Sequence, residues 1–191
     1  MSFVGGVGYS NIDLIYSGLD RLPDKGEEIF ARGFSMQFGG GIPATMINLS
    51  RLGVESRIIT FAGHDLFSEF VKKTLNSYPV KTVNLYKGNK MPVVLSSTLL
   101  YCGDRSFISY TDGMDLNDAV MDEVYENLKG AYVVDMHVGF LDVYKRLKKD
   151  GCIQIFDTGW EDDLTLEKYK DYLEIADYYI PNQKEAMKIT G

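Results

Sequence analysis

The stretch Phe38–Gly53, FGGGIPATMINLSRLG, runs three glycines into a proline and then into an amphipathic segment that ends at a glycine. Apolar residues recur at helical spacing from Ile42 to Leu52, which predicts a helix. Pro43 falls near the first turn, where its missing N–H costs little. A glycine run before a helix can hold a phosphate, admit another ligand to the backbone, or make a turn. No Gly-Lys-Ser/Thr pattern follows, so this is not a Walker A loop.

Outward from this stretch, the chain contains repeated strand–helix units, which are typical of an α/β fold with a parallel sheet covered by helices. The predicted buried strands are SFVGGVG (2–8), SRIITFAG (56–63), AYVVDMH (131–137), CIQIFDTG (152–159) and DYYIP (177–181).

Four further segments alternate apolar and polar residues, which is the pattern of strands with one open face. They lie at about 12–18, 27–37, 92–102 and 106–111. Such strands fit poorly in a fully covered parallel sheet. We therefore expect a small antiparallel sheet that projects from the main domain, with a hairpin at the Gly-Asp pair 103–104.

The composition is that of an ordinary globular protein: 191 residues, 45% hydrophobic and 25% charged, with a net charge of −7. No Lys/Arg cluster suggests a nucleic-acid partner. The N-terminus has no basic region and no apolar run approaches 18 residues, so we expect no signal peptide, no membrane span and a cytoplasmic location. Cys102 and Cys152 fit no metal-binding spacing and are expected to be free, buried thiols.

Asn11 and Asp13 follow the first predicted strand, at the edge where open α/β sheets bind ligands. Two residues apart in an extended segment, they point to the same side. An amide and a carboxylate together suit vicinal hydroxyls. The alternative is a turn Asn and a surface Asp.

Three later residues are also candidates. Asp157 lies at the carboxyl end of a predicted strand, where it is either a ligand-binding residue or a residue with no role in a site. Asn182 and Glu185 have the spacing of a capping box, which could also stand beside a metal–phosphate group. The alternative is a helix cap alone. His64 and His137 lack any metal-binding pattern and are interpreted as loop or strand-end residues.

In this order, the segments resemble the PfkB, or ribokinase-like, family of carbohydrate kinases over nearly the whole chain. The matching segments are GVGYSNIDLIYSGLDRLPDKGE (6–27), FGGGIPATMINLSRLG, ITFAGHDLFSEF, MPVVLSSTLLYCGDRSFISYTDG and ADYYIPNQKEAMKITG. Each motif is weak alone, but the matching order and spacing make the resemblance strong.

The first of these segments, residues 6–27, resembles the family's opening strand, its Asn-x-Asp substrate contact and its first lid strand. The resemblance implies a three-layer α/β/α sheet with a small β-sheet lid, and transfer of the γ-phosphoryl of ATP to a sugar hydroxyl with Mg²⁺. The implied substrate contacts are Asn11, Asp13, Gly39, Gly40, Gly41, Ala44 and Arg105. The implied ATP-side residues are Asp157, Asn182 and Glu185, with Glu185 reaching Mg²⁺ through water.

The family's catalytic aspartate lies in a Gly-Ala-Gly-Asp motif, and this sequence contains no such motif. The chain ends about one and a half turns into its last predicted helix. We therefore expect residues 1–191 to be the N-terminal portion of one kinase domain, with the C-terminal part missing and no turnover by the chain alone. Ala44 stands where ribokinases often have a sugar-binding Asn, so ribose is not the expected sugar.

Three alternatives stay open: a nucleoside kinase of the same superfamily, a non-catalytic sugar-binding module, and a flavodoxin-like binding domain without a lid. The partners expected on the kinase interpretation are a small sugar and ATP. One-sided lid strands would leave an apolar face exposed, so a homodimer through the lid is also expected.

Overall fold

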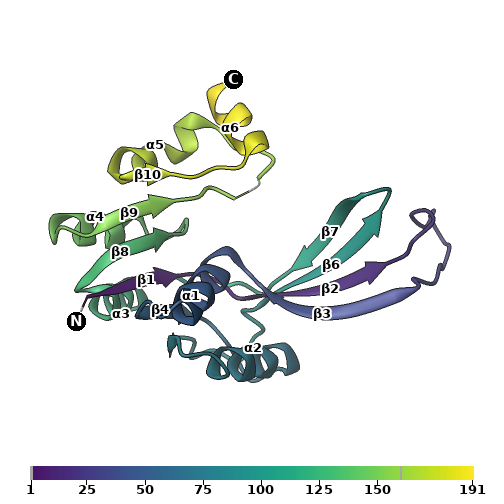
Figure 1. The fold of residues 1–191 in the computed structure, drawn as a ribbon, viewed down its shortest axis with the longest axis horizontal. Helices are drawn as coiled ribbons and strands as arrows, with labels where there is room; N and C mark the ends of the chain where they lie inside the picture. The colour runs from purple at the N-terminus through teal and green to yellow at the C-terminus, as the bar shows by residue number, and fades with distance from the viewer. Residues whose placement is uncertain (1, 160) are drawn as a thin grey trace.

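The computed structural model describes residues 2–159 and 161–191. These residues form a parallel main sheet flanked by helices and a second, smaller sheet that projects from it (Figure 1). The predicted three-layer α/β/α architecture with a β-sheet lid is confirmed. We call the smaller sheet the lid sheet.

The main sheet has six strands, and every neighbouring pair runs parallel. Its spatial order is β10 (Tyr178–Tyr179), β9 (Ile153–Phe156), β8 (Ala131–Met136), β1 (Phe3–Val7), β4 (Ser56–Thr60) and β5 (Lys81–Asn84). The buried central strands are apolar runs rather than alternating ones, as expected for a sheet that is covered on both faces.

Helices cover both faces of this sheet. One face packs against α1 (Gly41–Arg51) and α2 (Leu66–Asn76), in a core that includes Met46 and Val71. The opposite face packs against α3 (Asp118–Leu128), α4 (Leu141–Lys149) and α5 (Leu166–Ile175). The last helix, α6 (Gln183–Thr190), adds Ile189 to the same core as α3 to α5.

Two glycines in β1 allow helices to approach the central strand from both sides. A Cβ added at Gly5 would lie 2.7 Å from the Leu128 side chain of α3, and one added at Gly6 would lie 2.5 Å from the Ile42 side chain of α1. Both distances are shorter than packed carbon atoms allow. The absence of side chains here therefore sets how close α1 and α3 lie to the sheet.

The lid sheet has the order β3 (Gly33–Gly39), β2 (Asn11–Ser17), β6 (Val94–Tyr101) and β7 (Asp104–Tyr110). It is a mixed sheet, so the expectation of an antiparallel sheet is wrong for one pair: β2 and β6 run parallel. The reason is that both strands leave the main domain at the same place, where the Val94 amide donates to the Ser10 carbonyl at 3.0 Å.

The predicted strand at 27–37 is wrong in its first half. Residues 27–32 lie in a loop, and β3 begins at Gly33 because its partner β2 ends opposite it, at Ser17. The turn between β6 and β7 is where the sequence predicted a hairpin. Its central residues, Cys102 and Gly103, have φ values of 50° and 78°, which fit a type I′ turn.

Two other expectations can be compared with the described residues. Cys102 and Cys152 are both free, but only Cys152 is buried, so the expectation of a buried Cys102 is wrong. The tight turn places Cys102 at the tip of the lid, where little packs against it. Over the part of the chain that the structure describes, no helix combines the length and apolar character that crossing a membrane requires.

The close contact at Gly6 gives a stability prediction. Gly6→Ala should lower the free energy of unfolding by about 1–3 kcal/mol, because the new methyl group overlaps Ile42 at the start of α1. Gly41→Ala is the matched control, since a Cβ there meets no atom within 4 Å and a helical Ala is favoured over Gly. Urea unfolding of both variants checks this. Equal midpoints would contradict the packing argument.

Candidate functional site

The carboxyl ends of β1, β8 and β9 meet the N-terminus of α1 at one edge of the main sheet. A cavity of about 210 Å³ lies at this edge. Its walls are Gly41, Ile42, Thr45, Asp135, Met136, His137, Val138, Asp157, Thr158, Gly159 and Ile180. Open α/β sheets bind their ligands at this edge, so the cavity is the candidate site of the main domain.

The three glycines of the opening stretch have three different surroundings. A Cβ at Gly39 would lie 2.7 Å from the Asp13 carboxylate, so a side chain there would displace that group. Gly40 has a φ of 103° and lies against the Tyr9 carbonyl, which makes it the residue that turns the chain from β3 into α1. Gly41 has open space around it and lines the cavity.

Asn11 and Asp13 lie in β2, two residues apart, so their side chains are on one face of the lid sheet. Asn11 is paired with Gly39 and Asp13 with Gln37 in the neighbouring strand. Burial raises the pKa of Asp13, and the positive charge of Arg105 lowers it in part. Gly39, which a Cβ would bring against the Asp13 carboxylate, precedes Gly41 of the cavity wall by two residues, whereas Asn11 and Asp13 are not part of that wall.

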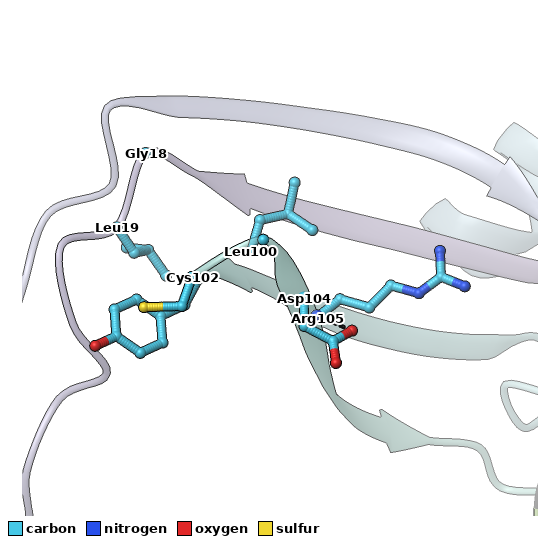
Figure 2. Close-up of a pocket in the computed structure, with 8 residues that line it drawn as sticks. Gly18, Leu19, Leu100, Cys102, Asp104 and Arg105 are labelled. Atoms are coloured by element: carbon cyan, nitrogen blue, oxygen red, sulfur yellow. Dashed lines mark hydrogen bonds between the residues drawn. The ribbon is translucent and has the colours of Figure 1, made fainter.

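Arg105 lies near the far end of the lid, where β7 pairs Arg105 with Leu100. Figure 2 shows its guanidinium extending away from Cys102 and back along the sheet. This direction agrees with its effect on Asp13, four register positions closer to the main domain. The cavity drawn in Figure 2 is open and belongs to the lid tip, and none of its walls comes from the main sheet.

Asp135 and His137 line the cavity, although the sequence interpretation did not single out Asp135 and gave His137 no role in a site. Burial raises the pKa of Asp135 to about 6, a hydrogen bond from Thr45 lowers it, and the charge of Asp157 raises it further. Burial lowers the pKa of His137, which contacts the Val138 carbonyl through Nδ1 at 2.8 Å. The sequence does contain a signal for Asp135, since it is the one charged residue in the otherwise apolar strand AYVVDM.

The other predicted site residues are divided between the cavity and its surroundings. Asp157 is exposed and lines the cavity beside Asp135. Ala44 is exposed in the first turn of α1 and is not part of the cavity wall, whereas its neighbour Thr45 is. The helical turn therefore directs residue 45, rather than residue 44, toward the ends of β8 and β9.

Asn182 and Glu185 form a capping box at the start of α6. The Glu185 amide donates to Asn182 Oδ1 at 3.0 Å, and Glu185 Oε2 accepts from the Asn182 amide at 2.9 Å. The capping box that the spacing predicts is therefore confirmed. Glu185 is only 4% exposed and both of its carboxylate oxygens are engaged with Asn182.

The fit of these residues to Mg²⁺ is poor. A carboxylate whose two oxygens already accept hydrogen bonds is badly placed for direct coordination of a divalent ion. Among residues 2–159 and 161–191, no group of three or more His, Cys, Asp or Glu side chains could hold a metal. The described residues alone do not assemble a metal site.

Comparison with known proteins places this geometry in a family. The sequence profile of the pfkB family of carbohydrate kinases matches residues 1–191. The chain is 35% identical over 92 residues to an uncharacterized sugar kinase from Pyrococcus horikoshii, a match that covers 46% of this chain and 30% of that protein.

Solved structures share the fold. Arabidopsis thaliana ribokinase complexed with ribose and ATP superposes with a TM-score of 0.76 and 23% identity, over 100% of this chain and 64% of that one. A nucleoside kinase from Methanocaldococcus jannaschii gives 0.74 and 18%, over 98% of this chain and 62% of that one. The chain thus spans less than two thirds of the length of these relatives. Since the family profile covers all 191 residues and the fold agrees with it, the chain belongs to the pfkB family of carbohydrate kinases.

Proposed function

We propose that this chain forms the sugar-binding side and the lid of an ATP-dependent kinase, which transfers the γ-phosphoryl of ATP to a sugar hydroxyl. A cytoplasmic location goes with this proposal, since ATP is the phosphoryl donor. The observation that carries the proposal is the contact between Gly39 and the carboxylate of Asp13, next to Asn11. Because residue 39 has no side chain, it covers neither the amide of Asn11 nor the carboxylate of Asp13, at the end of β3 that leads into α1.

The chemistry of this pair suits a sugar. Two neighbouring hydroxyls can donate to the Asp13 carboxylate, while the Asn11 amide can both donate and accept. Partial burial strengthens such hydrogen bonds because water competes less for the partners. Gly39, Gly40 and Gly41 let the sugar approach the backbone, and Arg105 supplies a positive charge on the same face of the lid.

The ATP side of the proposal rests on family membership, and fewer residues of this chain support it than support the sugar side. Phosphoryl transfer depends on positioning, on charge neutralisation and on a base for the attacking hydroxyl. The Gly-Ala-Gly-Asp motif that provides the family's base is absent from the sequence. We assign Asp157, Asn182 and Glu185 to the nucleotide side, with any contact of Glu185 to Mg²⁺ made through water.

The lid sheet has a second face that supports a homodimer. Strand register puts the polar side chains of Asp13, Ser96 and Ser109 on one face, where the two serine hydroxyls lie 2.8 Å apart. The other face carries Ile12, Leu14, Tyr16, Phe34, Met36, Phe38, Leu95, Leu99, Ile108 and Tyr110. Phe34 and Ile108 on this face are 62% and 71% exposed, and such apolar patches mark interfaces.

The sugar contact can be tested by calorimetry. Asp13→Asn should weaken sugar binding by roughly 10- to 100-fold, the effect of losing a charged hydrogen-bond acceptor. Gly39→Ala should weaken it similarly while changing stability little, because the new methyl group displaces only the end of the Asp13 side chain. Asp24→Asn, in the exposed loop after β2, is the control. If both Asp13→Asn and Gly39→Ala bind the sugar with unchanged affinity, Asp13 and Gly39 do not belong to the sugar site.

Turnover by the chain is a separate prediction. An assay that couples ADP release to NADH oxidation, run with a panel of sugars and adenosine, should show no activity, because the sequence lacks the motif that carries the base. Robust turnover with any sugar would overturn this. Calorimetric binding of adenosine and of no sugar would favour the nucleoside kinase alternative instead.

The dimer prediction uses two adjacent residues on opposite faces of β7. Ile108→Asp should convert a dimer into a monomer, because it places a charge in the apolar face. Phe107→Asp is the matched control: Phe107 is 52% exposed, but lies on the polar face. Sedimentation equilibrium gives the molar mass of the parent chain, of Ile108→Asp and of Phe107→Asp. A monomeric parent chain, or the same molar mass for both variants, would contradict the proposal.

A further inference from the structure

The cavity at the carboxyl edge of the main sheet contains two carboxylates and no compensating cation. Asp135, from the end of β8, and Asp157, after β9, both line it. No lysine or arginine contributes to its wall, and no ion pair recorded among the described residues involves either aspartate. The wall is therefore negatively charged when both groups are ionised.

Neighbouring groups do not cancel this charge. His137 is the remaining titratable group on the wall, and its burial lowers its pKa, which favours the neutral ring at pH 7. Glu161, whose charge also acts on His137, is ion-paired with Lys168, and this lysine pairs with Glu161 and Asp163 rather than with Asp135 or Asp157. The N-terminus of α1 faces the cavity at Gly41, but a helix dipole amounts to only about half a positive charge.

Asp135 also lacks a full set of hydrogen-bond donors. Asp135 is 9% exposed as a residue, and its one hydrogen-bond partner among the described residues is the Thr45 hydroxyl. That hydroxyl also lies 3.0 Å from the Gly41 carbonyl, to which it can donate its only proton. A buried carboxylate that served only the fold would be expected to have a cation or several donors around it.

We infer that the sugar bound at this site carries a protonated amino group, which the carboxylate of Asp135 recognises, while the charge of Asp157 on the same wall adds to the attraction. The inference rests on the proposed sugar-kinase function and names its substrate class. An ammonium group has three donors and one positive charge, and so satisfies both the empty acceptor positions and the charge of the wall. A divalent metal fits less well, because the described residues offer no group of three ligands that could hold one.

The binding test compares matched sugars by calorimetry at pH 7.5: D-glucosamine against D-glucose, and 1-amino-1-deoxy-D-fructose against D-fructose. The amino member of at least one pair should bind about 10-fold or more tightly, as expected for a charged hydrogen bond. Asp135→Asn should reduce this ratio to near one. Asp171→Asn, which changes the net charge equally at an exposed ion pair on α5, should leave the ratio unchanged.

The outcomes separate this inference from the proposed function. If the neutral sugars bind as tightly as their amino partners, or more tightly, the inference is overturned while the sugar-binding proposal stands. If no neutral or amino sugar binds, both are overturned. An amino preference that survives Asp135→Asn would also overturn the assignment of Asp135.

Unfolding in urea distinguishes a binding role from a structural one. A folded-state pKa of Asp135 near 6 lies above the ordinary value of 3.8, so ionisation of this group opposes folding. This loss of folding stability is absent below about pH 4, grows as the pH rises toward 6, and reaches its full size above pH 6. Asp135→Asn should therefore raise the urea midpoint at pH 7.5, and the gain should disappear at pH 3.5. A lower midpoint at pH 7.5 would mean that the carboxylate serves the fold, and would overturn the inference.

Discussion

The contact between Gly6 of β1 and Ile42 of α1 is the constraint on which the rest of the structure depends. It brings the first turn of α1 against the central strand, and no side chain can stand between them. Since α1 starts directly after Gly40, the end of β3 is fixed at the same point, and β3 in turn pairs along the whole of β2. One backbone-to-side-chain contact thus relates the main sheet, the cavity wall and the lid sheet.

The lid sheet has two chemically different faces because side chains alternate along every strand. The polar face begins with Asn11 and Asp13 near the main domain and continues outward to Arg105. The opposite face is apolar, and its contacts, such as the Tyr16 and Phe34 rings at 5.4 Å, do not cover it. A one-residue change of register would exchange the two faces, so the pairing of Asn11 with Gly39 fixes which face carries Asn11 and Asp13.

Most of the fold could be predicted because it follows from local patterns: apolar runs for the covered strands, alternation for the lid, and a glycine run followed by Pro43 for the start of α1. The errors arose where tertiary structure decides. Alternation continues through residues 27–32, but β2 supplies no partner there. Thr45 was not singled out because the side of α1 that faces the cavity cannot be known without knowing where β8 lies. Asp135 was missed for a related reason, since its significance depends on Asp157, 22 positions along the chain, lining the same cavity.

The two ends of the candidate site differ in how their charge is balanced. Burial raises the pKa of Asp13, and the positive charge of Arg105 on the same face of the lid sheet offsets part of that rise, so the protein supplies some counter-charge to this carboxylate. Asp135 has no such neighbour, and Asp157 raises its pKa further. A ligand that reaches from the lid to the ends of β8 and β9 would therefore meet Asp13, whose charge Arg105 offsets in part, at one end. At the other end it would meet Asp135 and Asp157, which have no cation beside them on the cavity wall. On the proposed function, this asymmetry would orient the ligand, with its hydroxyls at the lid and a positive charge against the main sheet.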